Sequence, residues 1–186
     1  MPSQESLHSA HIREIEQVGR GRPTQRDAHV VRSWLRCLDQ YQLDPAQACE
    51  AYIVPDGRLR EHRQQSEALI NIARTGLDHL FKQVAGQNYV LLLADRQGVT
   101  VEFLGDPLQT DKLRKAGLYL GSEWSEPRAG TCAVGACLET GEALTIHQTD
   151  HFDNTHTPLS CTAAPSTTPM ANWPPCWIFR CSVRPA

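Results

Sequence analysis

Histidine and cysteine side chains gather in the second half of the sequence, where they could bind a metal. His147, His151, His156 and Cys161 are separated by four, five and five residues, and both residue types are good zinc ligands. These positions fall on a predicted strand, a loop and a second strand, whereas structural zinc sites use closely spaced ligand pairs. We therefore favour the interpretation that His151 and Phe152 close the rim of a pocket, and we expect no metal ion.

Three cysteines suggest a second kind of chemistry, nucleophilic or redox catalysis by a thiol. Cys132 and Cys137 are five residues apart in a stretch of small residues, and Cys161 follows on a predicted strand. A reactive thiol needs a base or a cation beside it, and His151 is a candidate base. Free cysteine more commonly packs as a small apolar residue. We favour packing, and we expect neither a catalytic residue nor a cofactor.

The segment WSEPRAGT, residues 124–131, is the strongest candidate for a binding site. Glycine at a helix start lets ligand atoms approach backbone N–H groups, and a threonine hydroxyl adds a polar contact. An alternative, compatible with binding, is that Glu126 or Thr131 caps the helix. The residues predicted to bind a ligand are Trp124, Glu126, Gly130, Thr131, His151 and Phe152.

The elements that must position these residues indicate an α+β fold. Apolar residues at helical spacing predict helices over residues 27–41 and 59–84, and small residues predict a third over 130–140. Alternating or continuous apolar runs predict four strands, of which the first two form a hairpin; they cover residues 89–94, 99–104, 143–147 and 160–164. A helical turn is expected at 110–116, and the charged segment at 5–26 is expected to be a solvated helix or a frayed end.

Composition excludes several classes of protein. The 186 residues are 40% hydrophobic, enough for a core, and the net charge of −3 argues against a strongly basic nucleic-acid binder. The longest apolar run, residues 89–94, is too short to span a membrane, and the polar N-terminus is unlike a secretory signal. The seven cysteines are an odd number and are predicted to be free thiols. We expect a cytoplasmic protein without membrane contact.

Four segments occur in an order that resembles one family. They are RSWLRCLDQYQLDP, YVLLLADRQGVTVEFLGD, the stretch from AGLYLGSEW to IHQTDHF, and LSCTAAP. Together, over residues 26–165, they closely resemble the N-terminal GAF sensor region of sigma-54-dependent transcriptional activators of the acetoin and glycerol catabolism type. Cys132 stands where that family usually has asparagine. The resemblance implies a GAF-like antiparallel sheet flanked by helices that binds a small-molecule effector.

After Pro165 the resemblance stops, and the genetic code offers an explanation. In a shifted reading frame, each new codon consists of the last base of one present codon and the first two bases of the next. Five residues of that frame are then fixed by the genetic code: Met170-Ala171 gives Gly, Asn172-Trp173 gives Leu, Trp173-Pro174 gives Ala, Cys176-Trp177 gives Leu and Trp177-Ile178 gives Asp. These residues fit the pattern D-P-x-G-x-L-x-x-V-L-D-x-S that continues the family. We infer a one-base deletion after the Pro165 codon, which predicts that the last strand of the sheet is lost or disrupted.

These observations predict three regions and a function. Residues 1–56 form an N-terminal helical region, 57–165 a GAF-like sensor domain, and 166–186 an out-of-frame tail. The family implies a parent protein that contacts sigma-54 RNA polymerase and DNA through an AAA+ ATPase and a helix-turn-helix, which the chain lacks, so it is expected to be truncated before them. A homodimer is possible. The alternatives are a thiol- or metal-dependent GAF-fold redox sensor or enzyme, and a non-functional product of a frameshifted gene.

Overall fold

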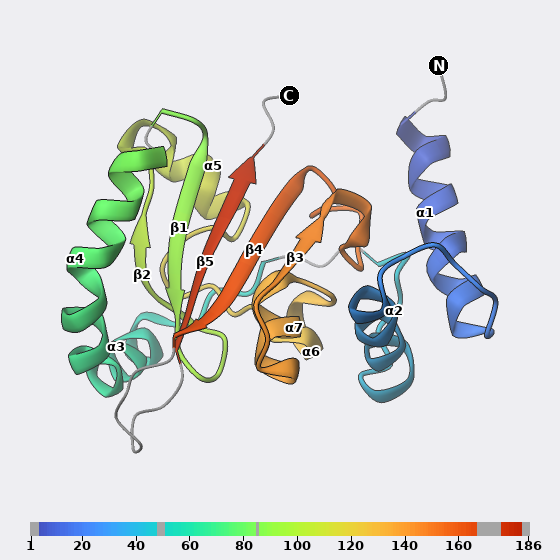
Figure 1. The fold of residues 1–186 in the computed structure, drawn as a ribbon, viewed down its shortest axis with the longest axis horizontal. Coiled ribbons are helices and arrows are strands. Elements are labelled where there is room, and N and C mark those ends of the chain that lie inside the picture. The colour runs from blue at the N-terminus through green and yellow to red at the C-terminus, as the bar shows by residue number, and fades with distance from the viewer. Residues whose placement is uncertain (1–3, 48–50, 85, 167–175, 184–186) are drawn as a thin grey trace.

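A five-stranded antiparallel sheet organises the chain in the computed structural model, which describes residues 4–47, 51–84, 86–166 and 176–183 (Figure 1). The strands lie in the order β2-β1-β5-β4-β3. Their bounds are β1 Tyr89–Ala94, β2 Thr100–Leu104, β3 Leu144–His147, β4 Leu159–Ser166 and β5 Cys176–Val183. The predicted α+β class is confirmed, as is the hairpin of β1 and β2, which is closed by the turn DRQG.

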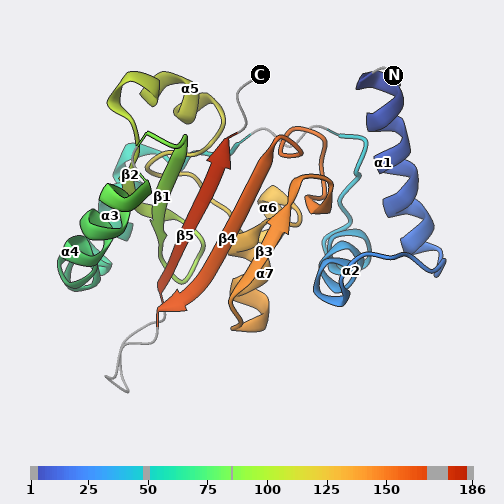
Figure 2. The same cartoon turned by 45° about the horizontal axis from the view of Figure 1, so that its top comes forward.

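Different helices cover the two faces of the sheet, because successive side chains of a strand point to opposite sides. Leu93 of β1 and Val101 of β2 pack with Leu69, Ile70 and Leu77. On the other face, Val90, Leu92 and Ala94 belong to a larger core with the helix that follows residue 132. The helices after residue 50 are α3 Asp56–Gln65, α4 Glu67–Val84, α5 Thr110–Lys115, α6 Glu126–Ala129 and α7 Ala133–Thr140. Figure 2 shows α3 and α4 beside the β1–β2 edge, with α6 and α7 below β3 and β4.

The N-terminal helices pack beside the β3 edge of the sheet (Figures 1 and 2). They are α1 Gln4–Gly19, α2 Ala28–Leu35 and η1 Arg36–Gln40, a π-helical turn that continues α2. Although α1 was expected to be solvated or frayed, its Ile15 and Val18 are buried in the larger core with Val30 and Trp34 of α2. We call residues 4–40 the arm. The burial of α1 was difficult to predict from the sequence, because its few apolar residues are separated by many charged ones.

The predicted helix over residues 59–84 is two helices, which is a correction. The chain turns at Ser66, whose φ of −100° and ψ of 6° end α3 before α4 begins at Glu67. In α4, Leu69, Ile70 and Leu77 are buried against the sheet, while Ile72 is 60% exposed. The predicted elements at 110–116, 130–140, 143–147 and 160–164 are confirmed as α5, α7, β3 and β4, although α7 begins at Ala133.

The expectation that the last strand is lost is wrong. Residues 176–183 form β5, which pairs with β1 along one edge and with β4 along the other. The segment CWIFRCSV is rich in the aromatic and branched residues that favour strands, and the two prolines at 174 and 175 come before the strand rather than inside it. The proposed deletion after Pro165 is not tested by this finding, and residues 167–175 lie outside the described part of the chain.

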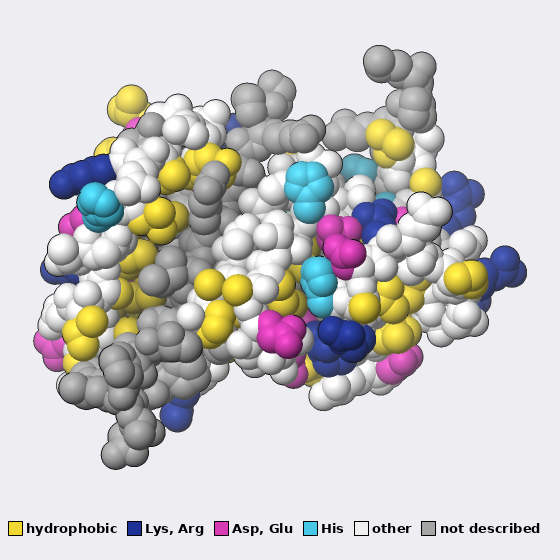
Figure 3. Space-filling view, viewed as in Figure 1, with side chains coloured by type: hydrophobic (Ala, Val, Ile, Leu, Met, Phe, Trp, Pro, Cys, Tyr) yellow, Lys and Arg dark blue, Asp and Glu magenta, His cyan; other side chains and the backbone are white. Residues whose placement is uncertain are grey.

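Charge is distributed rather than concentrated on the face drawn in Figure 3. Among the described side chains, acidic, basic and histidine groups lie interspersed with small hydrophobic patches. None of the helices in the described part of the chain combines the length and the apolar character that a membrane span requires.

Candidate functional site

Trp124, the first of the predicted binding residues, borders a small cavity. The cavity lies between residues 51–52, the segment 122–124, α6 and His156. Its indole packs edge-on against the His156 imidazole, with 5.3 Å between ring centroids. Arg128 lies over the Tyr52 ring at 4.7 Å. The volume is about 10 Å³, room for about one water molecule. The cavity is lined by Ala51, Tyr52, Ser122, Glu123, Trp124, Arg128, Ala129 and His156.

A buried carboxylate shapes the loop that carries His156. Asp153 accepts hydrogen bonds from the backbone N–H groups of Thr155 and His156, at 2.6 and 3.1 Å. The second Asp153 oxygen lies 2.7 Å from His156 Nδ1. Burial alone would raise the pKa of Asp153, but the hydrogen bond and the charge of His156 outweigh it and hold that pKa below its usual value. The loop is therefore a fixed turn that holds the imidazole against Trp124.

Glu126 and Thr131 point toward the arm rather than toward the cavity. The side chain of Glu126 is fully buried, and its two oxygens receive Arg36 Nε at 2.8 Å and Arg36 Nη2 at 2.7 Å. Ser33 Oγ lies 2.5 Å from Glu126 Oε1 and 2.7 Å from Thr131 Oγ1. Cys37 Sγ is 3.6 Å from the same threonine hydroxyl. We call these five residues the Glu126 network; it joins α2 and η1 to the α6–α7 segment.

Gly130 and Phe152 meet at a contact that only glycine permits. Gly130 has φ 65° and ψ −160°, a conformation almost restricted to glycine. A Cβ atom at this position would lie 2.7 Å from Phe152 Cβ. The Phe152 backbone N–H donates to Thr131 O at 3.3 Å, and its ring is buried in the larger core. The missing Cβ at Gly130 therefore makes room for the Phe152 side chain of the same chain.

His151 is buried beside the arm, and the residue before it takes part in a second contact with the arm. His151 Nδ1 lies 2.9 Å from Gln148 O. Arg26 binds Asp150 Oδ1 and Glu14 Oε2, each at 2.7 Å, and stacks over the Trp34 ring at 5.5 Å. Trp34 Nε1 donates to Asp150 O at 2.9 Å. We call Glu14, Arg26, Trp34 and Asp150 the Asp150 clasp.

The structure thus separates the six predicted site residues into three pairs. Trp124 borders the cavity, and His151 lies near it, 6.1 Å from His156 between ring centroids. Glu126 and Thr131 belong to the Glu126 network, and Gly130 and Phe152 pack together. Sequence reasoning did not assign Ser33, Arg36 or Asp153 to the site. The available signal was Ser33, a polar residue inside the apolar stripe of α2.

Cys132 and Cys137 have surroundings that disfavour a nucleophilic thiolate. Burial raises the pKa of Cys132 well above its usual value and raises the pKa of Cys137 to about 12. Cys132 donates to Trp124 O at 3.1 Å and accepts from Gly135 N at 3.3 Å, so it caps α7. Within the described ranges, His, Cys, Asp and Glu side chains do not assemble in threes with metal-binding geometry.

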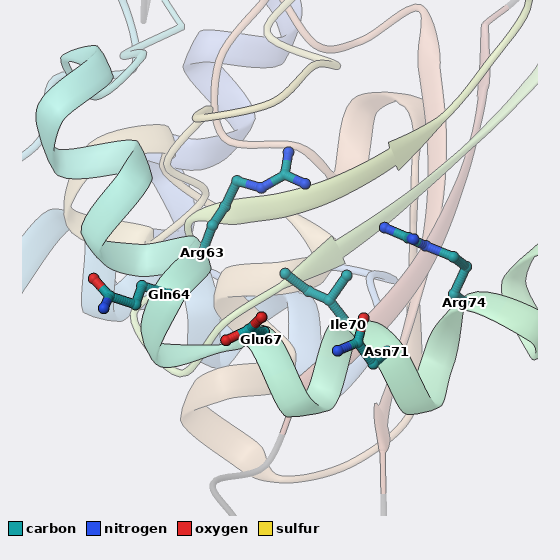
Figure 4. A pocket seen from close by; sticks show the side chains of 6 residues that line it. All are labelled: Arg63, Gln64, Glu67, Ile70, Asn71 and Arg74. Carbon is teal, nitrogen blue, oxygen red and sulfur yellow. The ribbon is translucent and has the colours of Figure 1, made fainter.

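A larger hollow of about 330 Å³ lies at the junction of α3 and α4 (Figure 4). It is open and polar, and its two arginines, Arg63 and Arg74, both reach Glu102 of β2, at 3.8 and 3.2 Å. Glu102 therefore offsets part of the positive charge that this hollow would offer an anion. None of the six predicted site residues lines it.

Comparison with known proteins agrees with this architecture. Residues 68–168 match the family described as GAF domain. The acetoin catabolism regulatory protein of Cupriavidus necator is 58% identical over 139 residues, which cover 75% of this chain and 21% of that protein. The glycerol metabolism operon regulatory protein of Citrobacter freundii is 24% identical over 136 residues, which cover 73% of this chain and 21% of that protein.

A solved structure shares the fold. A chain in the crystal structure of the E. coli DhaR(N)-DhaL complex matches with a TM-score of 0.75 and 18% identity, over 84% of this chain and 53% of that chain. The chain spans about a fifth of the length of the two curated relatives, at 21% of each. The similarity to them therefore concerns one region of much longer proteins.

Proposed function

The chain belongs to the GAF domain family, and from this membership we propose that it is a sensor domain that binds a small hydroxyketone or polyol without chemical conversion. The observation that carries the proposal is the cavity beside Trp124. An indole and an imidazole supply contact area there, and Ser122, Glu123 and Arg128 supply polar groups. A few polar groups around aromatic walls are the usual composition of a small-molecule site.

The similarity to the two regulators supports the choice of ligand class and a regulatory role. One relative is named for acetoin catabolism and the other for glycerol metabolism, so these two compounds are the first probes. We propose that the parent protein is a cytoplasmic sigma-54-dependent activator, in which this domain controls modules that contact RNA polymerase and DNA. A homodimer of the sensor belongs to the same proposal. The raised pKa values of the buried thiols favour binding over thiol chemistry.

Calorimetric titration of the full chain with acetoin and with glycerol tests the proposal. A ligand with so few atoms should bind in the micromolar to millimolar range, by the limit of about 1.5 kcal/mol per non-hydrogen atom. Trp124→Phe removes part of the aromatic wall and should weaken binding several-fold. Arg58→Gln is the matched control, because Arg58 forms an exposed pair with Glu61 on α3. Equal affinities of Trp124→Phe and the unmodified chain would place the site elsewhere.

A further inference from the structure

The arm is attached to two of the segments that border the Trp124 cavity, α6 and the loop that carries His156; residues 51–52 and 122–124 form the rest of the border. The first attachment is the Glu126 network, in which Arg36 of η1 binds the buried carboxylate of Glu126 through two hydrogen bonds. Glu126 begins α6, the helix that also carries the cavity residues Arg128 and Ala129. Because a buried carboxylate without its partner is costly, this pair favours the docked position of the arm.

The second attachment is the Asp150 clasp, which holds the loop that carries His156, another segment at the border of the cavity. Arg26 reaches Asp150 Oδ1 at 2.7 Å, and Trp34 donates to the Asp150 carbonyl at 2.9 Å. Asp150 lies at the start of the loop that ends with His156, the imidazole packed on Trp124. The arm therefore holds α6 through α2 and η1, and it holds the His156 loop through Arg26, which precedes α2, and Trp34 of α2.

With both attachments made, the cavity has room for about one water molecule, at about 10 Å³. A hydroxyketone or a polyol is larger than water, so it enters only if the bordering segments separate. Separation pulls α6 and the His156 loop away from positions that Arg36 and Arg26 hold. Ligand entry and arm docking therefore compete.

We propose that the arm is a strap that closes the Trp124 cavity, and that ligand binding and arm docking oppose each other. The inference rests on the proposed function, because it describes the regulation of that same cavity. By linkage, a ligand that loosens the arm binds more tightly to a chain whose arm is already loose. The released arm is the signal that such a sensor passes on.

Hydrogen exchange without ligand tests the strap by itself. In the full chain, the double variant Arg26→Gln/Arg36→Gln should exchange the amides of residues 124–135 and 147–157 about tenfold faster or more, while β1, β2 and α4 keep their rates. Arg58→Gln, the control with an exposed ion pair, should leave all segments unchanged. Unchanged rates in the two bordering segments of the double variant would overturn the proposal.

A milder variant distinguishes local opening of the cavity border from destabilisation of the whole fold. Trp34→Phe keeps an aromatic ring in the core but removes the N–H that binds Asp150 O. It should raise exchange in residues 147–157 by a smaller factor, with β1, β2 and α4 unaffected. Faster exchange throughout the chain in this variant as well would show that Trp34 only stabilises the fold, and that outcome too would overturn the strap.

Acetoin titration then tests the sign of the coupling. The double variant should bind acetoin about fivefold more tightly or more, and saturating acetoin should speed amide exchange in α1 and α2 of the unmodified chain. Equal or weaker affinity in the double variant would overturn the opposition. If neither chain binds acetoin or glycerol, the proposed ligand class fails, whereas the exchange experiment without ligand still decides whether the arm closes the cavity.

Discussion

The β1–β2 side and the arm side of the sheet are held in different ways. On the first, α4 packs on β1 and β2 through Leu69, Ile70 and Leu77, and Glu102 pairs toward solvent with Arg63 of α3 and Arg74 of α4. His62 of α3 also pairs with the buried Asp95, at 2.6 Å between Nδ1 and Oδ2. On the second, the arm is joined to α6 and to the His156 loop by a buried carboxylate, a guanidinium between two acids and an indole N–H.

The difference separates stability from response. The aliphatic contacts of α4 contain no titrating group, so pH does not change them directly. Buried charges and hydrogen bonds require particular partners and protonation states, and they are expensive when one partner leaves. A sensor benefits when its moving part is held by contacts of the second kind. Each of the following experiments acts on one of the two regions, except the first, which acts on both.

The largest effect is expected from removal of the strand that joins the two regions. Deletion of residues 167–186 removes β5, which pairs with β1 on one side and β4 on the other. The remaining strands would form two separate two-stranded pairs, which are marginal in water. Circular dichroism should show no cooperative melting. Deletion of residues 184–186 spares β5 and is the control; a cooperative transition of similar midpoint in both chains would show that β5 is dispensable.

The strand also marks a limit of sequence reasoning. The reading-frame argument compared residues 166–186 with the sequence pattern that continues the family. Strand formation depends only on the residues that are present. CWIFRCSV has strong strand propensity, and a gap between β1 and β4 offers unpaired backbone groups on both sides. The one-base deletion itself stays a prediction, and resequencing the gene downstream of the Pro165 codon tests it.

The second effect in size concerns the apolar side alone. Leu77 is 1% exposed between α4 and the sheet, so Leu77→Ala should lower the free energy of unfolding by about 2–5 kcal/mol through lost burial and a cavity. Amide exchange in the arm relative to the sheet should not change, because no partner of the arm is touched. Ile72→Ala on the exposed face of α4 is the control. Selective loosening of the arm by Leu77→Ala would contradict the division into two regions.

A third experiment strains the arm side from within the site. Gly130→Ala places a Cβ 2.7 Å from Phe152 Cβ at a backbone conformation that alanine avoids. We expect a loss of about 2–3 kcal/mol in the free energy of unfolding, from backbone strain with added overpacking. Gly76→Ala, in α4 where a Cβ meets open space, should be neutral or stabilising. An equal melting temperature for Gly130→Ala and the unmodified chain would show that the Phe152 contact adjusts freely.

A fourth, smaller effect is expected from pH. Burial and the charge of Arg26 lower the pKa of His11 from its usual 6.5, so the unfolded chain binds a proton more readily than the native one. The stability contributed by neutral His11 is complete above pH 6.5 and declines as the pH falls below that value. The protection of α1 amides, taken relative to their intrinsic exchange rate at each pH, should therefore fall on acidification below about pH 6.5, before the protection of α4 does.

His11→Gln tests the origin of this pH dependence. The variant removes the titrating ring and should flatten the response of α1 between neutral pH and pH 5, although Glu14 and Asp153 also act on this position. His79→Gln, at an exposed position of α4, is the control. A steep response that persists in His11→Gln would assign the titration to other groups.

The sequence predicted local elements better than the contacts between distant segments. The hairpin was predictable because its alternation and its turn are contiguous, and the segment from Trp124 to Thr131 stood out for the same reason. The pairing of Glu126 with Ser33 and Arg36 was not, because it joins residues 93 and 90 positions apart. Helical periodicity likewise continues through Ser66, although the backbone turns there.

The smallest effect is expected at the N-cap of α7, on the arm side. Cys132 caps α7, accepting from Gly135 N at 3.3 Å and donating to Trp124 O at 3.1 Å. Asparagine offers a stronger acceptor and a stronger donor at a similar reach, and it is among the best N-cap residues. Cys132→Asn should therefore raise the free energy of unfolding by about 0.5 kcal/mol, and Cys132→Ala should lower it by about 1 kcal/mol. Chemical denaturation of the three chains measures both changes, and Cys137→Ala measures what is lost with another buried thiol, one that donates to Glu142 O at 2.9 Å. If asparagine destabilises as much as alanine, the space around residue 132 is shaped for sulfur, and the argument from N-cap preference fails at this position.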